Sequence, residues 1–319
     1  MRLRLQALVA CSFCVCIVPA LQASPVAELF VLDRGAFGGA GGIIRLAFRT
    51  PQDALSLAGD LMSPAGIGID PAGENLYVAY MGSAAIARIQ LYPTMSTVLA
   101  SAGELQRPAA IAVAENGDLY VADLGELDGA AKVLRIDGAT GAQSIVSSGG
   151  NLVAPSGLVL DASGDLLVVD RDAFGGGGGL IRIETGTGEQ SLVSSGGSFL
   201  DPNGVALSDG GVLVVDEAAF GTGGVIRVDL TTGAQTILST GGSFVAPKAI
   251  AVPAPFHEIY VVDSEAQSGS GAVILVYPWG EQEIYASGEN FAEPVAIAAI
   301  WRITAVQPSS WSRIKFLFR

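Results

Sequence analysis

The sequence has little of the side-chain chemistry on which most enzymes depend. Its 319 residues include 3 cysteines and 1 histidine, and the cysteines lie together near the N-terminus at Cys11, Cys14 and Cys16. One histidine cannot build a multi-histidine zinc site. If a leader that contains the cysteines is removed, the remaining chain has no disulfide and no thiolate nucleophile. These absences exclude thiol chemistry and multi-histidine metal sites.

Charged residues are also scarce, and positive charge is the scarcer sign. Only 15% of the residues are charged, and 17 Lys and Arg stand against 31 Asp and Glu, which gives a formal net charge of −14. All of the acidic residues lie between Glu28 and Glu293. A body this acidic repels nucleic acid and anionic lipid, because it cannot neutralise their phosphates. We therefore expect no nucleic-acid partner.

Residues 1–23 have the composition of a signal peptide. Arg2 and Arg4 precede an apolar run over residues 7–18, and small residues follow that run. A run of about 12 residues is too short to span a bilayer. We therefore expect a secreted or periplasmic protein without a transmembrane segment. Leu8–Cys11 resembles a lipoprotein cleavage box, which leaves lipidated and cleaved soluble export as alternatives.

The rest of the chain is repetitive. One short β-branched segment, which ends in aspartate in five of its copies, recurs six times at intervals of 43 to 47 residues. Most units also contain a segment that begins with proline, a segment with a central arginine, and a segment that follows a Thr-Gly turn. The copies of the first segment are Leu29–Asp33, Leu76–Tyr80, Leu119–Asp123, Leu166–Asp170, Val212–Asp216 and Ile259–Asp263. The prolines are Pro64, Pro108, Pro155, Pro202, Pro247 and Pro294.

Four short strands per unit, separated by turn residues, are typical of a β-propeller blade. We name the strands A (from the proline), B (ending in aspartate), C (with the arginine) and D (after Thr-Gly). Strand A alternates small with large residues, and the small ones would let the innermost strands crowd around a central axis.

The chain order indicates how the ring closes. Residues 24–300 begin in a strand B, at 28–33, and end in a lone strand A, at 294–299. Pairing of these two strands would complete a blade and remove the free sheet edges. We therefore predict one all-β domain, a six-bladed β-propeller with four-stranded blades, over residues 24–300. Residues 301–319 depart from the repeat and are predicted to form a basic, aromatic C-terminal tail.

These segments resemble those of the NHL-repeat and SMP-30/gluconolactonase-like propellers. The resemblance is clearest at 108–137 and 155–184, where Pro-x-Ala/Gly-Ile/Leu, Gly-Asp-Leu-x-Val-x-Asp and Leu/Ile-Arg-Ile follow in order, and it extends over roughly residues 25–300. It implies a six-bladed fold, but such propellers serve as lactonases, lyases and non-catalytic binding modules. In the lactonase-type members the residue corresponding to Asn203 binds a catalytic divalent metal. Lys248 stands where those members carry an aspartate, which puts a metal site in doubt.

Three loops between strands B and C are glycine-rich near copies, with Phe37, Phe174 and Phe220 at the same position. We call the face that carries these loops, together with the residues before strand A, the upper face. The three phenylalanines either pin their own loops or form an aromatic rim that grips a partner. Together with Asn203 and Lys248 they are the candidate ligand-binding residues.

The aspartates that end strand B have two interpretations. A carboxylate after a strand accepts hydrogen bonds from the N–H groups of the following turn. Alternatively, carboxylates in related positions attract Ca²⁺. If a metal is bound, its ligands would be Asn203, Asp170 and Asp216.

We therefore expect an exported, non-catalytic and monomeric propeller that binds a protein or carbohydrate ligand and needs no cofactor. The alternative is a metal-dependent lactonase-like hydrolase that uses Ca²⁺ or another divalent cation.

Overall fold

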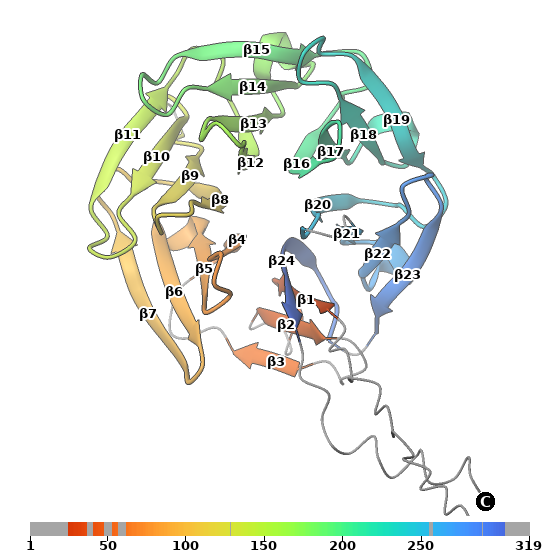
Figure 1. Cartoon of the computed structure of the whole chain (residues 1–319), viewed down its shortest axis with the longest axis horizontal. Coiled ribbons are helices and arrows are strands. Elements are labelled where there is room, and N and C mark those ends of the chain that lie inside the picture. Colours follow the sequence, from red (N-terminus) through yellow and green to blue (C-terminus); the bar gives the residue numbers. More distant parts are fainter. Residues whose placement is uncertain are drawn as a thin grey trace, which may run out of the picture. The chain divides into compact units, whose positions relative to one another are not determined.

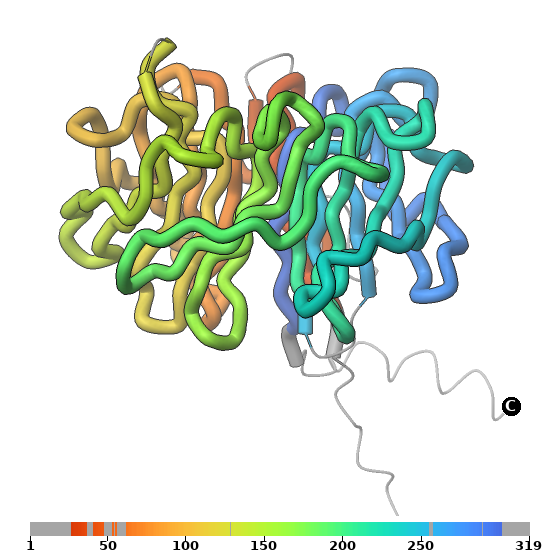
Figure 2. Tube along the Cα trace, turned by 90° about the horizontal axis from the view of Figure 1, so that it is seen from above, coloured from red at the N-terminus to blue at the C-terminus, as the bar shows by residue number. Residues whose placement is uncertain are grey.

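The computed structural model describes residues 25–36, 41–47, 53–56, 62–127, 129–254, 258–288 and 290–303. Within these ranges 24 strands form six four-stranded sheets around one central axis (Figure 1). Val26–Arg302 form one compact unit, which Figure 2 shows edge-on with its loops gathered at two opposite faces. The prediction of a six-bladed propeller is therefore confirmed.

The sheets are numbered as blades I to VI in the order of their strand B, and strand A is innermost in each. From the axis outward, blade I consists of β24 (Pro294–Ile303), β1 (Pro25–Asp33), β2 (Gly42–Ala47) and β3 (Asp53–Ser56). Blade II consists of β4 (Pro64–Ile69), β5 (Asn75–Tyr80), β6 (Ala85–Leu91) and β7 (Thr94–Ser101). Blade III consists of β8 (Pro108–Val113), β9 (Leu119–Asp123), β10 (Lys132–Ile136) and β11 (Gln143–Ser148). Blade IV consists of β12 (Pro155–Leu160), β13 (Leu166–Asp170), β14 (Gly179–Ile183) and β15 (Gln190–Ser195). Blade V consists of β16 (Pro202–Ser208), β17 (Gly211–Asp216), β18 (Gly224–Val228) and β19 (Gln235–Thr240). Blade VI consists of β20 (Pro247–Ala251), β21 (Ile259–Asp263), β22 (Ala272–Val276) and β23 (Gln282–Ser287). Four short helical turns follow strand B in the described loops, namely η1 (Met81–Ser83), α2 (Ala173–Gly176), η2 (Ala219–Gly221) and α3 (Ala266–Gly269).

Strand B is almost entirely buried, because neighbouring blades cover both of its faces. Every residue of β13 is buried. Leu166 and Val168 pack in the cluster shared with blade III, whereas Leu167 and Val169 pack in the cluster shared with blade V. This two-sided burial explains why strand B reads as a continuous apolar run rather than an alternating one. Among the described residues no helix is long and apolar enough to cross a membrane.

The innermost strands approach one another as closely as their backbones allow. A Cβ atom on Gly66 would lie 2.7 Å from the carbonyl oxygen of Ala109, and one on Gly157 would lie 2.9 Å from that of Asn203. Both approaches are closer than real Cβ contacts permit, so only glycine fits at these positions. The predicted role of the small residues in strand A is confirmed.

The ring closes where the sequence predicts it. β24, from the C-terminal end, pairs with β1 inside blade I. The carboxylate of Asp33 accepts hydrogen bonds from the backbone N–H groups of Ala292 (2.8 Å) and Glu293 (2.9 Å). β24 continues to Ile303, three residues past position 300, and Trp301 within it donates a hydrogen bond from Nε1 to the carbonyl oxygen of Pro253 (2.8 Å). Residues 304–319 lie outside the described residues.

A glutamine at the start of strand D ties each of four blades to the blade before it. Gln190 accepts a hydrogen bond from the N–H of Asn151 (2.7 Å) and donates from Nε2 to the hydroxyl of Ser147 (3.0 Å) and the carbonyl of Gly149 (2.9 Å). Its donors and acceptors all lie in the preceding blade, so the side chain joins two sheets. The equivalent residues are Gln143, Gln235 and Gln282, which make the same kind of contact.

The Gln190→Ala variant should lose about 1–3 kcal/mol of unfolding free energy, because it leaves a loop N–H and a carbonyl without partners. Gln106→Ala is the matched control, since Gln106 makes one 3.3 Å side-chain hydrogen bond, within its own loop. Urea unfolding followed by tryptophan fluorescence measures both. Equal midpoints for the two variants would show that the inter-blade contact contributes little.

Candidate functional site

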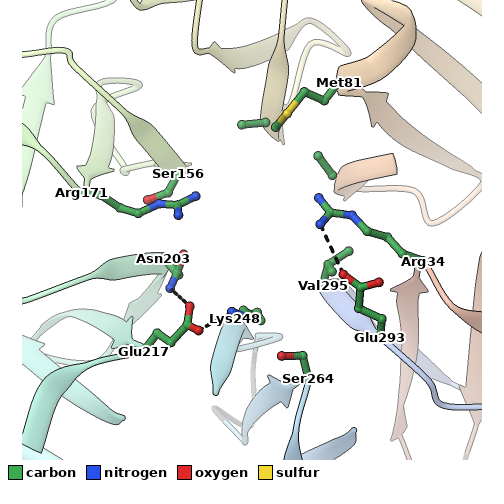
Figure 3. Close-up of a pocket in the computed structure, with 12 residues that line it drawn as sticks. Arg34, Met81, Ser156, Arg171, Asn203, Glu217, Lys248, Ser264, Glu293 and Val295 are labelled. Carbon is green, nitrogen blue, oxygen red and sulfur yellow. Dashed lines mark hydrogen bonds and ion pairs between the residues drawn. The ribbon is translucent and has the colours of Figure 1, made fainter. Parts of the chain in front are cut away.

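Three repeat positions converge at the upper end of the central channel. They are the residue after strand B, the residue before the proline, and the residue after the proline. Together they enclose a cavity of about 210 Å³ (Figure 3). Its lining residues are Arg34, Ala65, Met81, Ala109, Ser156, Arg171, Asn203, Glu217, Lys248, Ser264, Glu293 and Val295. We call this cavity the mouth.

The mouth is chemically asymmetric. Blades II and III contribute only Ala65, Met81 and Ala109 to it, whereas the charged side chains come from blades I, IV, V and VI. Because successive blades repeat the same backbone, this asymmetry arises entirely from the side chains at the three converging positions.

Asn203 and Lys248, two of the predicted site residues, meet in the mouth through Glu217. Asn203 is 9% exposed, and its Nδ2 donates to the carboxylate of Glu217 (3.1 Å) and to the backbone carbonyl of Asp201 (3.2 Å). The ammonium of Lys248 forms an ion pair with the other carboxylate oxygen of Glu217 (2.5 Å). Figure 3 shows the three side chains linked on one side of the cavity. A cation at this place would have to compete with Lys248 for Glu217.

Sequence reasoning did not single out Glu217. The signal was nevertheless present, because the residue after strand B differs from blade to blade beside a nearly constant aspartate. A position that varies where its neighbours do not is free of packing constraints and can carry function. The residues at this position are Arg34, Met81, Leu124, Arg171, Glu217 and Ser264.

Asp201 completes the charged side of the mouth. Burial raises the pKa of its carboxyl group, the nearby Arg171 guanidinium opposes that rise, and Glu217 and Asp216 add to it. The guanidinium lies 3.7 Å from the carboxylate, beyond hydrogen-bond distance. Arg171 therefore holds this carboxylate only weakly.

The strand-B aspartates bind backbone rather than one another. Asp170 is fully buried and accepts hydrogen bonds from the N–H groups of Val153 (2.8 Å) and Ala154 (3.0 Å) before strand A, and of Asp172 (3.0 Å) after strand B. Burial raises the pKa of Asp170, and these N–H donors partly offset that effect. Asp216 makes the equivalent bonds within blade V. These are the contacts expected of the capping interpretation.

The metal prediction gains no cluster of ligands from this arrangement. Asp170 and Asp216 lie in different blades, and each directs its carboxylate oxygens to N–H groups of its own blade. In the ranges that the structure describes, no group of three or more His, Cys, Asp or Glu residues is placed to hold a metal ion. Asn203 stays a predicted ligand only.

These hydrogen bonds from strand-B aspartates, which we call the aspartate clamp, also fix the backbone of the residue two before the proline, and in three blades this residue carries an exposed aliphatic side chain. The residue two before the proline is clamped through its N–H, and its side chain points away from the core. In blade II, where Tyr80 replaces the aspartate, the hydroxyl of Ser83 accepts the equivalent N–H bond from Met62 (2.8 Å). These rim residues are Val245 (51% exposed), Val153 (52%), Leu200 (58%) and Met62 (63%).

Phe174 and Phe220 both cover a residue of strand C and remain partly exposed. Phe174 and Phe220 have left-handed backbone conformations, with φ of +55° and +57°, which are uncommon for bulky residues. Their rings cover the first residue of strand C, since a Cβ on Gly179 would lie 2.5 Å from the Phe174 ring and one on Gly224 would lie 3.1 Å from the Phe220 ring. Yet the two side chains remain 39% and 41% exposed. Phe37 lies outside the described residues.

Comparison with known proteins supports the fold and nothing narrower. No protein-family model matches the chain, and no curated protein sequence matches it. A chain in the crystal structure of the nidogen/laminin complex superposes with a TM-score of 0.65 at 18% identity, covering 86% of this chain and 98% of that one. TolB from Acinetobacter baumannii superposes with a TM-score of 0.63 at 15% identity, covering 88% of this chain and 67% of that one. Since 908 solved chains match in this way, the likeness establishes a propeller and assigns no single activity to it.

Proposed function

We propose that this chain is an exported, non-catalytic propeller of the NHL type that binds a protein or carbohydrate ligand on its upper face. The observation that carries the proposal is that the upper face holds both the charged mouth and the exposed aliphatic rim residues whose backbone is fixed by hydrogen bonds. A polar centre with an apolar surround can orient a ligand and bury apolar surface in the same contact.

The rim favours a protein over a carbohydrate. Val153, Leu200 and Val245 stand at equivalent positions in three successive blades and are more than half exposed. Aliphatic side chains match the apolar core of a protein interface, whereas sugar rings stack on flat aromatic faces. Because the clamp holds their backbone in place, little conformational entropy is lost on binding. The similar chain in the nidogen/laminin complex also belongs to a protein assembly, which supports this choice.

The alternative, a lactonase-like hydrolase, would use Asn203 with a divalent cation. Its support is that Asn203 lies in the mouth next to the carboxylate of Glu217 and the backbone carbonyl of Asp201, and hard cations prefer such oxygen ligands. The Lys248–Glu217 ion pair counts against it, because the ammonium already neutralises the nearest carboxylate.

Site-specific photocrosslinking tests the binding surface. With a photoreactive residue at position 200 of the full chain, expressed in its native host, we expect a discrete adduct to one protein. The same residue at position 192, on the exposed outer strand β15, should give none. The partner identified from the adduct is then purified, and Leu200→Asp should weaken its affinity at least tenfold, because a charge is desolvated in the interface.

Two outcomes would overturn the proposal. One is equal crosslinking from positions 200 and 192. The other is a saturable rise in melting temperature with Ca²⁺, Mg²⁺ or Zn²⁺ that Asn203→Ala abolishes, which would favour the hydrolase. A metal at 100 times its Kd stabilises a protein by about 2.7 kcal/mol, so the shift would be readily measured.

A further inference from the structure

Two arginines face each other across the mouth. Arg34 from blade I and Arg171 from blade IV occupy the same repeat position, three blades apart, and therefore stand on opposite sides of the axis. In Figure 3 both guanidinium groups extend into the cavity from opposite walls. Their side chains are 36% and 43% exposed, so both remain open to a ligand.

Neither guanidinium has a close carboxylate partner among the described residues. Arg34 lies 3.7 Å from Glu293 and Arg171 lies 3.7 Å from Asp201. Arg34 also donates from Nε to the carbonyl of Pro64 (2.8 Å), which orients the group and leaves its terminal nitrogens available.

Three other cations of the propeller have a close carboxylate partner. Arg135 lies 2.6 Å from Asp118, and Arg182 is hydrogen-bonded to Asp161. Lys248 lies 2.5 Å from Glu217 in the same mouth. The two mouth arginines are thus held more loosely by carboxylates than these three cations are.

The charge and size of the mouth select the ligand. With Asp201, which lies beside Arg171, the mouth holds three cations (Arg34, Arg171 and Lys248) and three carboxylates, so its charges balance in a chain of net charge −14. A site whose charges balance repels an anion less than the surrounding acidic surface does, and its two loosely held guanidinium groups can attract one. At about 210 Å³, the cavity is smaller than typical small-ligand pockets of roughly 300–1,000 Å³. It matches a single side chain or the end of a chain.

We propose that the mouth binds one carboxylate group of a partner polypeptide between the guanidinium groups of Arg34 and Arg171. This inference rests on the proposed function and specifies the chemical group of the partner that the mouth binds. Each guanidinium presents a planar fork of N–H donors that matches the two oxygens of a carboxylate. The incoming group displaces the loosely held carboxylates of Glu293 and Asp201 from the arginines. The carboxylate belongs either to an acidic side chain or to the C-terminus of the partner.

Short peptides distinguish these two sources. The probes are acetyl-Gly-Asp-Gly-amide, which carries only a side-chain carboxylate, and acetyl-Gly-Gly-Gly with a free C-terminus. Acetyl-Gly-Asn-Gly-amide is the isosteric control without charge. Each is titrated into the full chain labelled with ¹⁵N-arginine at physiological ionic strength, and the Nε–H resonances are followed. Arg182, which is already paired, serves as the internal reference in the same spectrum.

We expect saturable shifts of the Arg34 and Arg171 resonances with at least one charged probe, and none with the asparagine probe. Arg171→Gln should weaken binding at least tenfold. It is the cleaner variant, because Arg34→Gln also removes the hydrogen bond to Pro64. Glu293→Gln should strengthen binding several-fold, because it removes an internal competitor. A purely structural role for these residues would not produce this opposite change.

Absence of shifts with both charged probes would overturn the inference, as would equal shifts of Arg182, which would indicate screening rather than a site. Failure of this inference can be distinguished from failure of the proposed function. If a partner crosslinks at position 200 and its affinity is unchanged in Arg171→Gln, the carboxylate inference is wrong while the binding surface stands.

Discussion

Gly188→Ala should destabilise the propeller far more than a typical glycine-to-alanine change. Gly188 lies in the Thr-Gly turn between β14 and β15, with φ at +76°. A Cβ atom there would collide with the carbonyl oxygen of Val146 in the preceding blade. The variant must therefore adopt an unfavourable left-handed backbone and also push two blades apart. Left-handed alanine costs about 1–2 kcal/mol, and overpacking adds about 1–3 kcal/mol.

Gly164→Ala is the matched control for this prediction. Gly164 has a φ of +85°, and its Cβ would meet nothing within 4 Å. It therefore carries the backbone penalty without the collision. Urea unfolding of both variants separates the two effects, and the difference between them should be about 1–3 kcal/mol. Equal losses would show that blades III and IV can separate at this contact without cost.

Asp33→Ala should open the ring at blade I. The Asp33 carboxylate accepts N–H bonds from Gly35 and Ala36 on one side and from Ala292 and Glu293 on the other, which joins the two ends of the propeller. Its loss leaves four N–H groups without their acceptor. Each buried, unsatisfied group costs about 1–3 kcal/mol, so the loss of stability should be at least about 3 kcal/mol.

Asp263→Ala is the matched control for the Asp33→Ala prediction. Asp263 accepts the same four bonds, from Val245, Ala246, Glu265 and Ala266, but all within the continuous chain of blade VI. Both variants should unfold at lower urea. Only Asp33→Ala should also raise the native-state hydrogen exchange of β1 and β24 above that of the other strands, because only it releases the closure. Uniform exchange across all six blades in both variants would refute a closing role for Asp33.

The candidate site was accessible to sequence reasoning only in part. Asn203 and Lys248 stand at a repeat position that turned out to face the mouth. Glu217 and Arg171 line the same mouth but belong to a different position of the repeat, so only the ring geometry brings the two positions together. Leu200 was not predicted, because the sequence does not show that this aliphatic loop residue is exposed.

The sequence by itself determined the architecture. The repeat has six copies of a four-strand unit, small residues in its innermost strand, and one blade divided between the two ends of the chain. A closed six-bladed ring follows from these features, because strand pairing and burial act locally on each repeat. The tertiary structure alone decided which side chains lie together on the upper face. The opposition of Arg34 and Arg171 and the contact of Glu217 with Lys248 depend on residues from different blades, far apart in sequence. Such contacts follow from the closed ring, and no local pattern encodes them.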